Sequence, residues 1–187
     1  MPNSTAFYAC GVRLVLLVLP AAGMPILAAA ATESQGVPTP QTIRIVTRIL
    51  AFQDKPPASG SPIAVTFNPA DAASVNEAKI IAGLFNTAHA VGDGDHHAVL
   101  VSDDELGTTT RIAGVVAATG VRTAPLRTAL ERLHVPCLTL DRAQVEHGSC
   151  MVALRTVPTV RILVNEANAA AAGVRFATAF RMMVQEL

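Results

Sequence analysis

The stretch that decides the fold is residues 135–164, VPCLTLDRAQVEHGSCMVALRTVPTVRILV. It contains three short apolar runs, which are Cys137–Leu140, Cys150–Leu154 and Val160–Val164. Continuous apolar runs of this length are typical of strands that are buried on both faces of a sheet. Arg142–His147, between the first two runs, predicts a short helical turn. The last two runs predict a hairpin in which Pro158 lies outside the central ladder.

The same alternation of strands and helices extends toward the N-terminus. Apolar runs predict three further strands, at Pro62–Phe67, His97–Ser102 and Ile112–Ala118. Apolar residues at helical spacing predict helices at Gln41–Gln53, from Asp71 or Ser74 to Phe85, and at Pro125–Leu133. Beyond the hairpin we expect a helix from Glu166 to the alanine run and a final helix at Phe176–Gln185.

This alternation predicts an α/β fold. We expect a mostly parallel sheet flanked by helices on both faces, with the C-terminal antiparallel hairpin at its edge. The length of 187 residues fits a single domain with a sizeable core.

The first 31 residues have the pattern of a signal peptide. Arg13 precedes an apolar run at Leu14–Leu19, and the segment ends in small residues at Ala28–Ala31. A membrane anchor is the alternative, but two prolines shorten the apolar part well below the roughly 20 residues of a spanning helix. We therefore expect export to the periplasm, cleavage of residues 1–31, a linker at 32–40 and a domain at 41–187.

Export leaves two cysteines, Cys137 and Cys150, in a compartment where disulfides persist. Each cysteine opens a predicted strand. If the two strands are parallel neighbours, both cysteines lie at the same end of the sheet, where their Cα atoms can approach the spacing of a disulfide. The alternative is a pair of buried free thiols.

Few residues suggest chemistry. Fourteen basic and fourteen acidic residues give no net charge, and the basic ones are scattered, so nucleic-acid binding has little support. The densest polar cluster comprises His89, Asp93, Asp95, His96, His97, Asp103, Asp104 and Glu105. Such residues could bind zinc, nickel or copper. Adjacent residues of a strand point to opposite faces, however, so we favour solvated loop residues over a metal site.

Templates for enzymes and cofactors fail on spacing. No glycine-rich phosphate or dinucleotide loop is present, and no serine lies in a nucleophile elbow. Cys150 lies three residues after His147, but no third group is evident that would orient the pair, and half of a disulfide is the simpler interpretation. We expect no catalytic residue, no metal and no cofactor.

Residues 135–187 resemble the closing segment of the YfiR-like family of periplasmic proteins. The resemblance is carried by Val135–Asp141, His147–Val152, Arg161–Asn165, Ala169–Ala172 and Gly173–Phe176. In this pattern Asn165 is a plausible N-cap of an alanine-rich helix, and Gly173 supplies the left-handed residue that ends it. The aromatic signature that the family carries after its first helix is absent here.

The resemblance implies a small periplasmic regulator that is not an enzyme. Such proteins are similar to a repressor that binds the periplasmic sensor domain of a membrane-bound diguanylate cyclase and holds it inactive. Cysteine redox state as an input and homodimer formation are further expectations from the family, and a sensor kinase is another partner of the same kind. The alternative is a periplasmic solute-binding protein, because Asp103, Asp104 and Asp141 follow predicted strands, where open α/β sheets bind ligands.

Overall fold

The computed structural model describes residues 36–92 and 95–187. The expected signal peptide, residues 1–31, and the first part of the expected linker lie outside these ranges. The last part of that linker begins beside the sheet, where Gly36 lies next to the Leu140 side chain and the carbonyl of Leu154. In the described ranges no helix has the length and apolarity that crossing a membrane requires.

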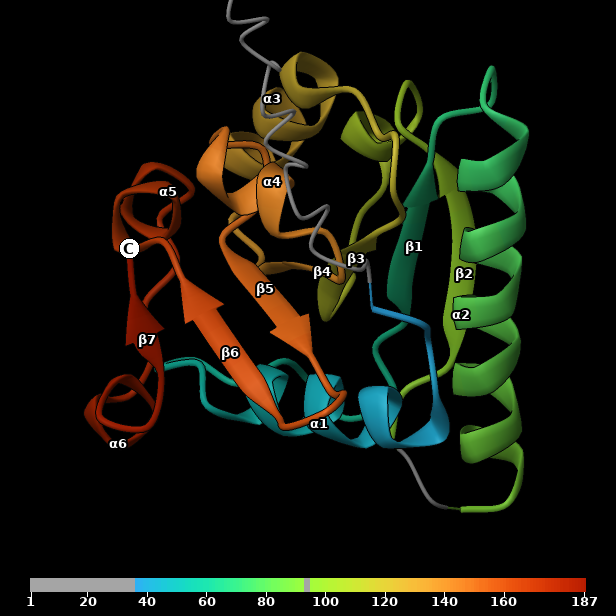
Figure 1. Cartoon of the computed structure of the whole chain (residues 1–187). Coiled ribbons are helices and arrows are strands. Elements are labelled where there is room, and N and C mark those ends of the chain that lie inside the picture. The colour runs from blue at the N-terminus through green and yellow to red at the C-terminus, as the bar shows by residue number, and fades with distance from the viewer. Residues whose placement is uncertain (1–35, 93–94) are drawn as a thin grey trace, which may run out of the picture. The chain divides into compact units, whose positions relative to one another are not determined.

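A seven-stranded sheet in the order β2-β1-β3-β4-β5-β6-β7 forms the centre of the domain (Figure 1). Its strands are β1 (Ile63–Phe67), β2 (Ala98–Ser102), β3 (Gly114–Ala117), β4 (Cys137–Thr139), β5 (Val152–Arg155), β6 (Arg161–Val164) and β7 (Gln185–Glu186). All neighbouring strands are parallel except β5 and β6, which form an antiparallel hairpin. The predicted α/β fold with a mostly parallel sheet and a closing hairpin is therefore confirmed.

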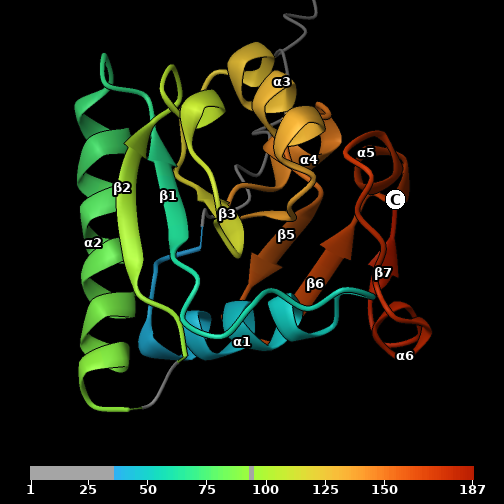
Figure 2. The same ribbon diagram turned by 180° about the vertical axis from the view of Figure 1, so that it is seen from behind.

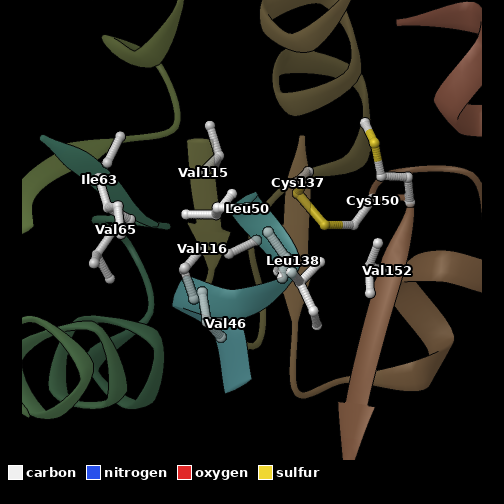
Figure 3. Packing of buried hydrophobic residues seen from close by; sticks show 14 of the residues in the cluster. Val46, Leu50, Ile63, Val65, Val115, Val116, Cys137, Leu138, Cys150 and Val152 are labelled. Carbon is white, nitrogen blue, oxygen red and sulfur yellow. A yellow bond between two sulfur atoms is a disulfide. The ribbon is translucent and has the colours of Figure 1, made fainter. Parts of the chain in front are cut away.

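Helices lie on both faces of the sheet, as the opposite views in Figures 1 and 2 show. They are α1 (Pro40–Ala51), α2 (Ala72–Ala90), the short 3-10 helix η1 (Leu106–Thr108), α3 (Thr123–Leu133), α4 (Arg142–Glu146), α5 (Glu166–Ala171) and α6 (Thr178–Arg181). Residues of α1 and α2 share one apolar cluster with Val116 and Leu138 of the sheet. Figure 3 shows Val46 and Leu50 of α1 beside these two side chains. The helix α3 packs on η1.

Polar residues begin the helices at the positions where the chain leaves a strand or loop. Thr39 caps α1 and forms a reciprocal pair of hydrogen bonds with Thr42. Of the two expected caps of α2, the carboxylate of Asp71 accepts from the amide of Ala73 at 2.9 Å. Ser74 instead accepts from the amide of Asn68 at 3.0 Å, which fixes the turn that leads into the helix.

The last part of the chain differs from the prediction. A final helix over Phe176–Gln185 is wrong, because α6 ends at Arg181 and residues 185–186 form β7. Two aromatic contacts hold the short helix, since the buried ring of Phe180 stacks on Phe52 at 5.5 Å and lies 5.1 Å from the buried ring of Phe176. The chain then turns so that β7 pairs with β6, and β7 rather than the hairpin is the outermost strand.

Candidate functional site

Cys137 and Cys150 form a disulfide, with their Cα atoms 5.1 Å apart. Cys137 is the first residue of β4, and Cys150 lies two residues before β5, its parallel neighbour. The helix α4 connects the two strands, so both cysteines lie at the amino ends of the strands, as Figure 3 shows. The expected pairing is confirmed, and the alternative of free thiols is wrong. A buried disulfide is typical of proteins in oxidising compartments.

Two asparagines of the next helix hold the segment that carries Cys150. The side-chain amide of Asn168 donates to the carbonyls of Cys150 at 2.8 Å and Val145 at 3.1 Å. The side-chain amide of Asn165 donates to the same Val145 carbonyl at 3.2 Å, while its oxygen caps α5 by accepting from the amide of Asn168. The predicted cap is confirmed. The hydrogen bond from the Asn165 side chain to the Val145 carbonyl was not predicted, although the sequence shows two asparagines three residues apart.

The glycine that ends α5 is also the one predicted. Gly173 has a φ of +69° and follows the last residues of the helix, where a left-handed conformation ends it. A Cβ at this position would lie 2.9 Å from Nδ1 of His134, which itself lies 3.0 Å from the carbonyl of Ala172. The motif residues Asn165 and Gly173 thus have structural roles that join the disulfide segment to the end of α3.

At the carboxyl end of β2, Asp103 and Arg122 form an ion pair whose carboxylate is fully buried. Asp103 is 1% exposed and accepts from the backbone amide and from Nε of Arg122, the latter at 2.9 Å. A second guanidinium nitrogen contacts both Asp103 and the exposed Asp104. Burial alone would raise the pKa of Asp103, but the hydrogen bonds and charge of Arg122 lower it further than burial raises it. Asp103 therefore stays charged and joins the carboxyl end of β2 to Arg122 at the start of α3.

The three aspartates of the solute-binding alternative do not face a common space. Asp103 and Asp104 bind Arg122, whereas Asp141 caps α4 by accepting from the amide of Ala143 at 3.0 Å. In an open α/β sheet, ligands bind where the strand order reverses, which here is between β1 and β3.

Hydrogen bonds of the protein itself span that point of reversal. Asn68, directly after β1, donates through its side chain to the carbonyl of Gly120 at 3.1 Å. Glu77 of α2 accepts from the amide of Thr119 at 2.8 Å. A small ligand would have to displace these bonds to enter between the two strand ends.

The histidines of the polar cluster separate as the sequence predicts, but the expectation that the whole cluster is solvated is wrong, because His96 and Asp103 are buried on protein partners. His96 is 8% exposed, and its Nδ1 lies 2.7 Å from the carbonyl of Ser61. His97 instead lies beside His89, with ring centroids 5.8 Å apart. Asp93 lies outside the described residues. In residues 36–92 and 95–187 no three His, Cys, Asp or Glu side chains are grouped so that they could hold a metal ion.

The nucleophile interpretation of Cys150 is incompatible with the oxidised protein. Its sulfur is bonded to Cys137, so no thiolate is available for attack. His147 is exposed and is the residue that follows α4. What the arrangement provides is a covalent and hydrogen-bonded brace between β4, β5 and α5.

Comparison with known proteins gives little further information. No protein-family model matches the chain, and no curated protein matches it. Among solved structures, the chain is similar to a conserved domain protein from Vibrio cholerae O1 biovar El Tor, with a TM-score of 0.48 and 12% sequence identity. The match covers 80% of this chain and 60% of the other, so the chain spans about three fifths of that protein.

Proposed function

We propose that this chain is an exported regulatory protein that binds the periplasmic part of a membrane-bound signalling protein, such as a diguanylate cyclase or a sensor kinase, and represses it. The observation that carries the proposal is the Cys137–Cys150 disulfide, which lies inside the segment that resembles the YfiR-like family. A stable disulfide fits a protein of the periplasm, where its partner would expose a sensor domain.

The roles of the motif residues support the same proposal. Asn165 and Gly173 begin and end α5, and the side chain of Asn168 holds the carbonyl of Cys150. The shared pattern thus describes a braced structural unit, which is what a protein that acts by presenting a surface requires.

The resembling segment also offers an apolar surface to a protein partner. Met182, Met183 and Leu187 are 79%, 65% and 55% exposed. Groups of exposed apolar side chains mark sites for protein contacts, and flexible methionine side chains, such as those of the adjacent Met182 and Met183, adapt well to a partner. We assign the partner contact to this C-terminal apolar surface, defined by these three residues.

Deletion of the gene in its own host tests the sign of regulation. If the partner is a diguanylate cyclase, we expect cellular cyclic-di-GMP to rise in the deletion strain and to return to normal when the full chain is restored. Complementation with a Met182→Asp/Met183→Asp variant should fail, because two carboxylates would have to be buried without partners at the contact.

The control is Val37→Asp, which adds one carboxylate, where the test variant adds two, at an apolar residue that is 73% exposed outside this surface. It should restore the normal level. Unchanged cyclic-di-GMP in the deletion strain, together with unchanged phosphorylation of the sensor kinases' response regulators, would contradict the proposal. A thermal shift on adding a small metabolite would then favour the solute-binding alternative.

A further inference from the structure

Basic residues that are scattered along the sequence come together at one end of the domain. Arg48 lies in the last turn of α1, and Lys55 follows shortly after that helix. The segment that carries Lys55 runs antiparallel beside the one that carries Arg175, since the amide of Asp54 donates to the carbonyl of Arg175 at 3.0 Å. Arg161 opens β6, whose start lies beside α1 in both Figure 1 and Figure 2. We call Arg48, Lys55, Arg161 and Arg175 the basic strip.

The domain itself does not neutralise the charge of the basic strip. All four side chains are exposed, and within the described residues none of them forms an ion pair. The acidic residues of the same parts of the chain, 36–60 and 155–187, are Asp54, Glu166 and Glu186. The last two contact Arg181 at 3.4 and 3.7 Å, so the carboxylate of Asp54 alone is left to balance the strip. An anionic partner would supply the missing charge.

The turn between β5 and β6 adds exposed apolar side chains to the same end. Val157 and Val160 are 68% and 45% exposed, and Val160 directly precedes Arg161. Both views show this turn beside α1 (Figures 1 and 2). Binding at the interface of a bilayer combines burial of apolar side chains among the head groups with attraction of cations to anionic lipids. The basic strip and the two valines offer both of these features, whereas a nucleic acid would use the cations alone.

Acidic residues gather at the other end of the domain. Asp71 follows β1, and Asp103, Asp104 and Glu105 follow β2. Arg122 contacts two of these four carboxylates. The carboxyl ends of β1 and β2 point away from α1 in both views (Figures 1 and 2). Such a separation of charge turns the basic strip toward an anionic surface and the acidic end away from it.

We propose that the basic strip binds the surface of a bilayer that contains anionic phospholipids, with Val157 and Val160 entering the head-group region. The four cations then lie at the lipid phosphates, and the acidic end of the domain faces away from the membrane. This inference does not rest on the proposed regulatory function, because lipid alone is sufficient for the binding. It also uses other residues than the C-terminal apolar surface.

Sedimentation with lipid vesicles tests the proposal on the protein as purified from the periplasm. The protein should bind vesicles made of phosphatidylglycerol and phosphatidylcholine in equal parts, and it should not bind vesicles of phosphatidylcholine alone. Binding should fall steeply with added salt, because the Debye length shrinks from about 10 Å at 0.1 M to about 3 Å at 1 M. Equal binding to both kinds of vesicle would overturn the proposal. So would a lack of binding to either, and the basic strip would then fit an acidic protein surface instead.

Charge reversal locates the binding surface. The variant Lys55→Glu/Arg161→Glu replaces two cations of the basic strip by carboxylates. It should bind the anionic vesicles at least about 25-fold more weakly than the wild type, since each cation near such a surface contributes roughly a factor of five. Both side chains are exposed and have no ion pair within the described residues, so the variant should fold as the wild type does.

The matched control is Lys79→Glu/Arg132→Glu, which makes the same change in net charge at exposed cations of α2 and α3. It should bind the anionic vesicles almost as tightly as the wild type. Equal weakening of both variants would overturn the proposal, because net charge rather than the basic strip would then decide the binding. The dependence of the wild type on lipid charge and on salt keeps the test decisive even if one variant fails to fold.

Discussion

Among single residues, the two bonded cysteines have the largest expected effect on stability. The disulfide closes a loop with a sequence separation of 13, which stabilises the fold by about 3 kcal/mol on the chain-entropy estimate. Replacing Cys137 and Cys150 together by serine should lower the free energy of unfolding in urea by about this amount. Reductant should lower the stability of the wild type and leave the double variant unchanged. A wild type that is equally stable with and without reductant would contradict the expectation.

Asp103 gives the second prediction at this scale. Since its pKa is lowered in the folded protein, its charge stabilises the fold above the unfolded pKa of about 3.9, and this contribution is lost as the pH falls through the folded pKa. Asp103→Asn should therefore destabilise at neutral pH, and the difference from wild type should shrink below about pH 4. Unfolding in urea at several pH values measures it.

The neighbouring Asp104 is the control, because it contacts the same guanidinium with a side chain that is 60% exposed. Solvent screens such a pair, so Asp104→Asn should have a smaller effect at every pH. Equal losses in the two variants would show that the buried position of Asp103 does not matter.

At the scale of helices and strands, the approach of α1 to β3 depends on a residue without a side chain. A Cβ at Gly114 would lie 2.7 Å from Cδ2 of Leu50 and 3.2 Å from the carbonyl of Pro136. Gly114→Ala should therefore destabilise by about 1–3 kcal/mol through overpacking. Gly83→Ala is the control, since nothing lies within 4 Å of the added Cβ on α2, and it should stabilise by about 0.5–1 kcal/mol. The same sign for both changes in thermal unfolding would contradict this packing.

The start of α5 is the other element with a specific expectation. Asn165→Ala removes an N-cap, which costs about 1 kcal/mol, and also the hydrogen bond to the carbonyl of Val145. We expect a loss of free energy of unfolding of more than 1 kcal/mol, about twice that of a cap alone. Asn76→Ala, at an exposed position on α2, should have almost no effect. An Asn165→Ala variant as stable as Asn76→Ala would contradict the interpretation that α5 holds the α4–β5 connection in place.

The elements differ in how far the sequence predicts them. Strands β1 to β6 are short apolar runs between turn residues, so the apolar runs place each of them within one or two residues. The end of the chain is different. The spacing of Phe176, Phe180 and the two exposed methionines is also compatible with one continuous helix. Its actual path is decided by stacking of Phe180 on Phe52, over a hundred residues away. Such long-range contacts leave no local signal.

In the candidate site, too, the sequence predicts some contacts and not others. The disulfide is predictable because each cysteine opens a predicted strand, and the two strands, β4 and β5, lie side by side in a parallel sheet. The partner of Asp103 is not, since Arg122 lies 19 residues later in a loop whose position depends on the whole sheet. The bonds of Asn165 and Asn168 to the α4–β5 connection also depend on the hairpin that returns the chain to β5.

For the whole molecule, we propose that this domain acts by binding a signalling protein of the membrane. The most direct measurement captures the full chain from detergent-solubilised membranes of its own host and identifies co-purified proteins by mass spectrometry. We predict a diguanylate cyclase or sensor kinase with a periplasmic domain, retained by Val37→Asp and lost with Met182→Asp/Met183→Asp. Recovery of no such protein with the wild type, or equal recovery with all three forms, would contradict the claim.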